Sequence, residues 1–343
     1  MGTGPVLLAL GWWVAWCLPP LATLRFDWLS DAPRAFYPAA VGVALLWAGG
    51  GGEGWNRARR NHAATVAILV VAATGLALAG WFVGGRMALR REVGDLLWEV
   101  VAAAQGDGPL LVVNLPSRIT PPTRLYPLGH EGIIPLPARV GATDLVAAHT
   151  GGGGAAFERA WGPVLPVLPY TVQPLGQVLT PDDLRDAGRV ALVVYRPDGV
   201  GLEEAGAVLP DIEGEPLVTF GEVLSLLSAS CARTGPKRVA LVTRWTALGP
   251  VGGMPTLFAH LVGADGVLLA QADGDPLRGL YPFSLWRPGE VVRDVRVFVG
   301  VPPGPTTVAL GVWDPATGLR WKAAGSEGGP LVDDTFRCVV QEP

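Results

Sequence analysis

The stretch FAHLVGADGVLLAQADGDPLRGLYPFSLWRPGEVVRDV (residues 258–295), followed by VPPGPTTVALGVWDPATGLRW (residues 301–321), decides the fold of the last third of the chain. Short runs of alternating apolar and polar residues are broken by clusters of Gly, Pro or Asp, at the spacing of about eight to twelve residues that short strands show. This pattern is typical of an antiparallel β-sandwich. We therefore predict a jelly-roll or immunoglobulin-like β-sandwich over residues 214–343.

The strands predicted for this sandwich begin and end at turn residues. They are Val218–Ser228, Arg238–Trp245, Thr256–Leu261, Val267–Ala270, Val291–Val299, Thr307–Trp313 and Thr335–Val340. Four tryptophans, at positions 245, 286, 313 and 321, fall in or between these strands. Such rings most often pack in a core, but an exposed ring also forms a platform for a sugar. Trp286 is our candidate for such a ligand-binding platform.

The composition indicates that part of the chain lies in lipid. Half of its 343 residues are hydrophobic, only 16% are charged and the mean hydropathy is +0.36, whereas soluble domains have about 25% charged residues. The net charge is −4 and no long basic run occurs, so the chain has no electrostatic surface suited to nucleic acid. Membrane lipid is an expected partner and nucleic acid is not.

Three apolar runs predict two or three membrane helices over residues 1–90. They are Val6 to Leu24, Tyr37 to Gly49 and Ala63 to Val83, and the third contains no charge. About 20 apolar residues span a bilayer, so the second run is short. Arginines lie on both sides of the third run, which leaves its orientation open. We expect a multi-pass protein of the cell membrane, whose carboxyl-terminal domains are extracytoplasmic.

The three cysteines exclude a disulfide-dense scaffold and a cysteine-rich zinc site. Cys17 lies in the first apolar run, and Cys231 and Cys338 lie near the start and the end of the sandwich. We expect the latter two to be small buried hydrophobes, which is the commoner state of cysteine. A disulfide between them is the alternative if the domain lies outside the cytoplasm.

Residues 91–213 show the pattern of a small α/β domain. Apolar residues at helical spacing predict a helix over residues 93–104, followed by an apolar strand at Leu110–Val113. The run Thr180-Pro181-Asp182-Asp183 has the residues that begin a helix, and Val190–Tyr195 is another apolar strand. Helices that alternate with fully apolar strands predict some parallel strand pairing.

The loop between these pairs, NLPSRITPPTRLYPLGHEGIIPLP at residues 114–137, holds the polar side chains best placed for chemistry. Binding groups often lie on loops that follow strands. Candidate ligand-binding residues are Asn114, Arg124 and Tyr126, and His130 with Glu131 is a candidate acid/base pair. Because adjacent residues of an extended loop point in opposite directions, a surface loop that braces proline turns is the alternative.

No metal or cofactor site is expected. Asp273 and Asp275 in QADGDP resemble a cation-binding pair, but calcium takes about 6 to 8 oxygen ligands. A solvated turn is the better interpretation. The glycines at 151–154 lack the G-x-x-x-x-G-K-[ST] pattern that binds phosphates.

The segments HLVGADGVLLAQADGDPLRGLYPFSLWRPGEVVRD (residues 260–294) and LGVWDPATGLRW (residues 310–321) resemble the carboxyl-terminal sandwich of bacterial multi-pass membrane glycosyltransferases. The types concerned are the dolichyl-phosphate-mannose mannosyltransferases and the aminoarabinose transferases. The segment VNLPSRITPPTRLYPLGHEG (residues 113–132) resembles the extracytoplasmic segment before that sandwich. The resemblance implies a polyprenyl-phosphate sugar as donor and an acidic catalytic residue in the first external loop.

Asp27 and Asp31 lie where the resemblance places that acid, although a solvated loop explains two acids in RFDWLSD equally simply. The chain departs from the family in having about three apolar runs instead of eight or more. We therefore expect a carboxyl-terminal remnant, a truncated reading frame or an accessory protein that shares these domains.

Two functions follow from the sequence. The first is the extracytoplasmic part of a glycosyltransferase-like membrane protein that lacks most of the catalytic bundle. The alternative is a non-enzymatic cell-envelope protein whose sandwich binds carbohydrate, such as an envelope glycan, or a partner. It is favoured by the lack of a nucleophile at a recognisable distance from a base. A soluble hydrolase is disfavoured because no G-x-S-x-G motif occurs.

Overall fold

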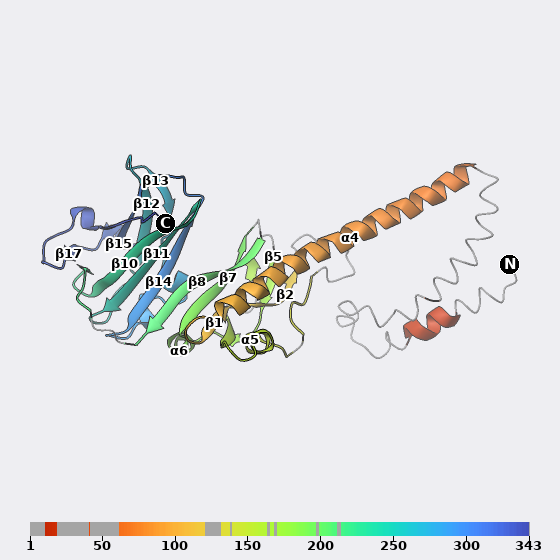
Figure 1. The fold of residues 1–343 in the computed structure, drawn as a ribbon, viewed down its shortest axis with the longest axis horizontal. Coiled ribbons are helices and arrows are strands. Elements are labelled where there is room, and N and C mark those ends of the chain that lie inside the picture. Colours follow the sequence, from red (N-terminus) through yellow and green to blue (C-terminus); the bar gives the residue numbers. More distant parts are fainter. Residues whose placement is uncertain are drawn as a thin grey trace. The chain divides into compact units, whose positions relative to one another are not determined.

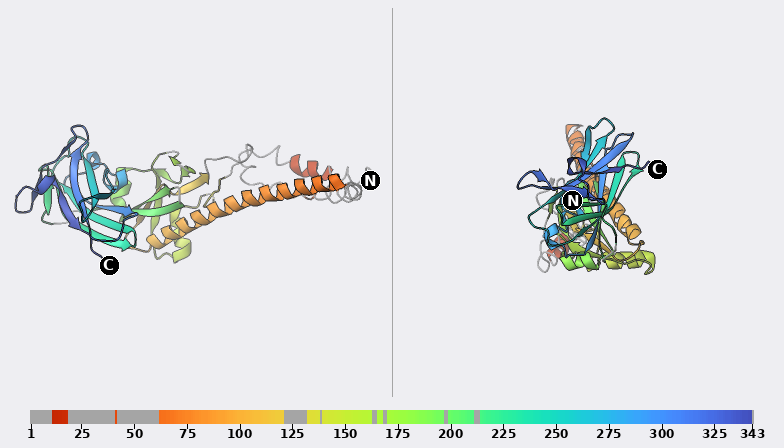
Figure 2. Two further views of the ribbon diagram at one scale, coloured as in Figure 1. Left: turned by 90° about the horizontal axis from the view of Figure 1, so that it is seen from above. Right: turned by 90° about the vertical axis from the view of Figure 1, so that its left-hand side faces the viewer.

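The computed structural model of the chain describes residues 11–18, 41, 62–120, 132–137, 139–162, 165–167, 170–196, 199–210 and 214–342. Figures 1 and 2 show its elements coloured along the sequence. The chain divides into two compact units. The first comprises residues 1–93, 118–135 and 169–171, and the second comprises residues 94–117, 136–168 and 172–343.

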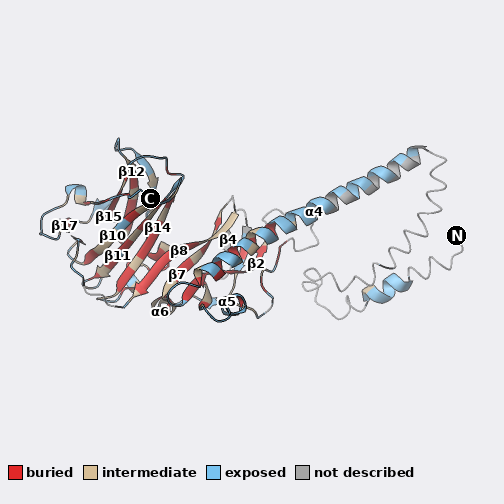
Figure 3. Ribbon diagram, viewed as in Figure 1, coloured by how far each residue is buried: buried red, intermediate tan, exposed pale blue. Residues whose placement is uncertain are grey.

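The main described element of the first unit is helix α4, His62–Ala103, whose residues from 94 onward belong to the second unit. Residues 11–18 are also helical. The apolar run predicted at 63–83 lies within α4, which is mostly exposed along its length (Figure 3). Val66, Leu69 and Trp81 are among its exposed residues. Among the described residues, no helix meets the length and hydropathy expected of a membrane span. The run at 37–49 lies outside the described residues except for residue 41.

Most of the second unit is β-structure. Its described strands include one sheet of ten, in the order β17-β9-β10-β11-β14-β8-β7-β1-β3-β6. In that order the strands are Ala323–Gly325, Val218–Phe220, Leu224–Gly235, Arg238–Ala247, Val291–Val299, Gly199–Leu209, Arg189–Arg196, Leu110–Val113, Ala156–Ala160 and Gln177–Val178. Outside this sheet, β2 is Pro116–Thr120, β4 is Leu165–Val167 and β5 is Tyr170–Pro174.

The predicted α/β pattern is confirmed at one end of this sheet. Strand β1 pairs in parallel with both β3 and β7. Helix α5, Ala142–Thr150, precedes β3, and helix α6, Pro181–Asp186, precedes β7. The predicted cap of α6 is also present, since the Thr180 side chain accepts a hydrogen bond from Asp183 N and the Asp183 carboxylate accepts one from Thr180 N.

The other end of the large sheet belongs to the predicted sandwich. A second sheet of five described strands has the order β13-β12-β15-β16, with β18 also paired to β15. These strands are Leu268–Gln271, Thr256–Gly263, Thr306–Asp314, Leu319–Arg320 and Phe336–Val339. A hydrophobic core joins the two sheets; it contains Cys231, Val239, Leu241, Ala259, Leu261, Val308 and Leu310.

Most of the predicted sandwich strands are confirmed, with one correction. The first predicted strand, Val218–Ser228, is two strands, β9 and β10, and β10 continues to Gly235. The break occurs because Gly221 and Glu222 have positive φ angles of 57° and 62°, which reverse the chain. The short strands β16 and β17 were not predicted.

One continuous sheet crosses the predicted boundary between residues 213 and 214. Strand β8 pairs with β7 on one side and with β14 on the other. At Gly206, where β8 meets β14, φ is 136° and a Cβ atom would collide with the carbonyl of Arg293. Glycine is therefore required at this junction.

An ion pair lies inside the sandwich on β14. The Asp294 side chain is 1% exposed and its Oδ2 accepts a 2.6 Å bond from Arg296 Nε. Arg296 also donates to the carbonyls of Ala272 and Gly274, and Asp294 Oδ1 accepts from Leu277 N at 2.7 Å. Residues 272–277 follow β13 of the small sheet. The hydrogen bonds of the ion pair therefore hold that segment against the large sheet.

The prediction of two free buried thiols in the sandwich was wrong. Cys231 on β10 and Cys338 on β18 form a disulfide with a Cα–Cα distance of 6.1 Å, within the usual range. The bond links a strand of the large sheet to one of the small sheet. The two cysteines are 107 residues apart in the sequence, and the disulfide that the sequence analysis gave as the alternative is the observed state.

We expect replacement of both Cys231 and Cys338 with Ala to lower the free energy of unfolding by about 2–4 kcal/mol, because the bond restricts the unfolded chain. Urea denaturation measures the change, with Cys17→Ala as the control that keeps the wild-type value. Two alkylatable thiols at these positions in unreduced, unfolded protein would contradict the assignment.

Candidate functional site

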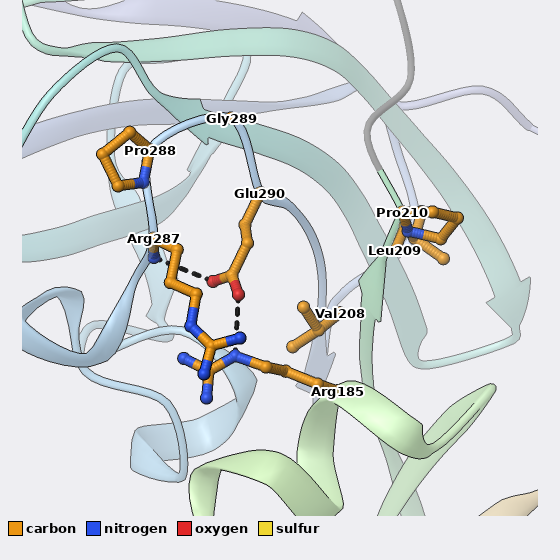
Figure 4. Close-up of a pocket in the computed structure, with 8 residues that line it drawn as sticks. All are labelled: Arg185, Val208, Leu209, Pro210, Arg287, Pro288, Gly289 and Glu290. Carbon is orange, nitrogen blue, oxygen red and sulfur yellow. Dashed lines mark hydrogen bonds and ion pairs between the residues drawn. The ribbon is translucent and has the colours of Figure 1, made fainter.

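Two hollows in the second unit bring polar side chains together. The first has a volume of about 440 Å³ (Figure 4). Its lining residues are Arg185, Val208, Leu209, Pro210, Arg287, Pro288, Gly289 and Glu290.

The polar groups of this first hollow are bonded to one another. Glu290 accepts hydrogen bonds from Arg185 Nε, Tyr281 Oη and Arg287 N, at 2.7, 2.7 and 2.9 Å. Arg185 also donates to Asp182 and to the carbonyl of Leu285. Burial alone would raise the pKa of Glu290, but the three hydrogen bonds and the Arg185 charge together hold that pKa below its ordinary value. We interpret this cluster as a brace between α6 and the start of β14.

The second hollow is a groove of about 240 Å³ on the face of the small sheet that points away from the sandwich core. Its lining residues are Phe258, His260, Val262, Gly266, Ala309, Arg320, Asp333, Thr335 and Arg337. On β12, Leu257, Ala259 and Leu261 belong to the core, so the alternate residues Phe258, His260 and Val262 lie on the opposite face.

The register of four strands places the polar groups of the groove in one row. Gln271 of β13 pairs with His260 of β12, His260 with Ala309 of β15, and Ala309 with Arg337 of β18. The small side chain of Ala309 therefore lies between two long polar ones. This difference in length produces the hollow.

An aromatic ring borders the row on one side. Phe258 pairs with Gly311, and a Cβ atom at Gly311 would collide with the Phe258 ring. The guanidinium of Arg320 lies over the Phe258 ring, 4.9 Å from its centroid, as in a cation–π contact. Arg320 is held further by the carbonyl of Asp333, at 3.0 Å from Nη1.

His260 is held by polar neighbours on its own side of the groove. Its Nε2 lies 3.2 Å from Asp273 Oδ2 and 3.1 Å from Gln271 Nε2. Asp273 Oδ1 also accepts a hydrogen bond from Ala259 N at 3.0 Å. The imidazole therefore has a fixed position in the wall of the groove, which is what a recognition residue requires.

The structure places two of the predicted site residues away from this groove. Asn114 is 3% exposed; its Oδ1 accepts from Trp161 N and its carbonyl accepts from Tyr195 Oη. Trp286 is 8% exposed and packs beside Tyr281 and Phe283, so neither face of its ring forms a platform. Both side chains are buried and make contacts within the protein interior.

Six further candidates lie outside the described residues. They are Asp27, Asp31, Arg124, Tyr126, His130 and Glu131. In the part of the chain that is described, no group of three or more His, Cys, Asp or Glu residues is arranged to hold a metal ion.

Sequence reasoning missed the groove residues His260, Arg320 and Arg337. The one available signal was alternation in Thr256–Gly263, which places His260 on the polar face of a predicted strand. The other members of the row, Gln271, Ala309 and Arg337, come from three other strands, and the register of these strands is not visible in the sequence.

Comparison with known proteins shows no matching family model and no matching curated protein. Among solved structures, the chain is similar to the carboxyl-terminal domain of Wzt, at 9% identity and a TM-score of 0.25, over 39% of this chain and 83% of that one. It is also similar to a β-glucuronidase of glycoside hydrolase family 2, at 12% identity and a TM-score of 0.19, over 32% of this chain and only 10% of that one. The CARDB domain of the Pyrococcus furiosus PF1109 protein, in complex with di-metal ions, matches at 13% identity and a TM-score of 0.21, over 38% and 96% of the two chains.

The brace at Glu290 predicts a pH-dependent contribution to stability. Because the folded-state pKa lies below the unfolded value of about 4.5, this contribution is fully present above pH 4.5 and is lost as the pH falls through the folded pKa. We expect Glu290→Gln to lower the free energy of unfolding by about 1–3 kcal/mol near neutral pH. Denaturant unfolding between pH 7 and 3 should show this difference shrinking in acid.

The matched control is Glu327→Gln, which removes a carboxylate from an exposed turn and should leave stability unchanged. A Glu290→Gln effect of the same size at pH 7 and pH 3 would contradict the assigned role of the carboxylate.

Proposed function

We propose that this chain is a membrane-anchored cell-envelope protein whose β-sandwich binds carbohydrate in the groove around His260. The observation that carries the proposal is the row formed by Gln271, His260, Ala309 and Arg337 across four strands. It offers hydrogen-bonding groups on both sides of a small apolar floor.

The chemistry of the groove suits a ring that carries hydroxyl groups. Amide, imidazole and guanidinium groups supply donors and acceptors in planar arrangements, which pair with neighbouring hydroxyls. Ala309 and Val262 provide apolar surface for the carbon skeleton of a sugar. Binding sites generally combine such an apolar floor with a few placed polar groups.

Two observations support an envelope location. The Cys231–Cys338 disulfide is of a kind that persists in oxidising compartments such as the periplasm or the cell exterior. The uncharged run TVAILVVAATGLALAGWFV at residues 65–83 has about the length that crosses a bilayer. This run is our candidate anchor, and it rests on the sequence alone, since no described helix meets the length and hydropathy expected of a membrane span.

A glycosyltransferase-like role stays a hypothesis that rests on the sequence resemblance. Its candidate acids, Asp27 and Asp31, lie outside the described residues. The described groove is an open surface without a nucleophile beside a base, so its geometry favours binding over catalysis.

We expect the full chain, solubilised in detergent, to bind members of a panel of neutral and acidic envelope oligosaccharides. Ala309→Leu should weaken that binding at least about tenfold, because the larger side chain fills the floor of the groove. The matched control is Ala240→Leu on β11, which lies on the outer face of the large sheet. Surface plasmon resonance measures both. No binding of any oligosaccharide at millimolar concentration, or equal binding by both variants, would contradict the proposal.

The anchor is tested separately by fractionation of cells that express the full chain. We expect the protein to resist carbonate extraction from membranes, and deletion of residues 63–83 to release it. In intact spheroplasts, added protease should digest the sandwich. Recovery of the undeleted chain in the carbonate-soluble fraction would rule out the proposed anchor.

A further inference from the structure

We infer that the groove selects acidic carbohydrate, with Arg337 binding a carboxylate of the sugar while His260 and Gln271 bind its hydroxyls. This inference rests on the proposed carbohydrate function and adds the class of ligand. It is drawn from the placement of charge in the groove.

Charged side chains gather at the groove. Its lining includes the guanidinium groups of Arg320 and Arg337 and the carboxylate of Asp333. The carboxylate of Asp273 is directed to His260 and the backbone of β12.

The two arginines differ in how far they are already bonded. Arg320 donates to the carbonyl of Asp333 and lies against the Phe258 ring, so its position is fixed. Arg337 is exposed, and within the described part of the chain it has no carboxylate partner. An exposed guanidinium without a partner keeps its planar set of donors available for a bidentate bond to a carboxylate.

The spacing of the row fits one sugar residue. Neighbouring strands lie about 4.8 Å apart, so His260 and Arg337, which are two strands apart with Ala309 between them, are separated by about 10 Å at the backbone. A pyranose ring above Ala309 therefore places substituents toward both side chains at once. A carboxylate on the Arg337 side and hydroxyls on the His260 side would then form hydrogen bonds with the polar groups on both sides of the groove.

The experiment compares uronic-acid oligosaccharides with their own methyl esters, which keep the shape and remove the charge. We expect the full chain to bind at least one free acid more tightly than its ester. Arg337→Gln should weaken binding of that acid by about 10- to 100-fold and leave ester binding unchanged. Arg337→Lys keeps the charge but loses the planar set of donors. Its affinity for the acid should lie between those of the wild type and Arg337→Gln.

The control variant is Arg244→Gln, which removes an exposed arginine from β11 on the other sheet and should bind like the wild type. Thermal unfolding of each variant shows that the chain remains folded. Raising the salt concentration should weaken binding of the acid and not of the ester.

The inference is overturned if acids and esters bind equally, or if Arg337→Gln binds the acid as the wild type does. In those cases carbohydrate binding itself stands and only the selection of charge fails. If neither acids, esters nor neutral sugars bind at millimolar concentration, the proposed function fails and this inference fails with it.

Discussion

The buried ion pair between Asp294 and Arg296 is the constraint on which the sandwich depends. Both side chains point from β14 into the core, where an uncompensated charge costs several kcal/mol. They are compensated by each other, by Leu277 N and by the carbonyls of residues 272 and 274. The chain after β13 must therefore pass over β14 in one conformation, since any other would leave these groups unpaired.

The ion pair also affects the groove, because it fixes the backbone on both sides of Asp273. The two carbonyls bound by Arg296 flank Asp273, and the Asp273 carboxylate in turn contacts His260 and accepts from Ala259 N. A charge in the core of the sandwich thus fixes a side chain on its outer face. The disulfide between β10 and β18 adds a second connection between the sheets, on the strand that carries Arg337.

Elements bounded by strong turn or capping residues could be predicted from the sequence. The strands of the sandwich and the cap of α6 are examples, because Gly, Pro, Asp and Thr act locally. The joining strand β8, GVGLEEAGAVL, was missed since its glycines and acids hide the apolar pattern. Asp294 and Arg296 look like solvent-exposed residues in an alternating strand, and their burial depends on a loop about twenty residues away. The groove was also beyond prediction because it needs the register of four strands.

Hydrogen–deuterium exchange of the full chain, with and without a bound acidic oligosaccharide, tests most directly whether the groove is the binding site. Ligand in the groove should slow exchange in β12, β15 and β18, which carry His260, Ala309 and Arg337, and leave the segment around Glu290 unchanged. Protection confined to Arg185, residues 208–210 and residues 287–290, which line the first hollow, would contradict the assignment of the groove.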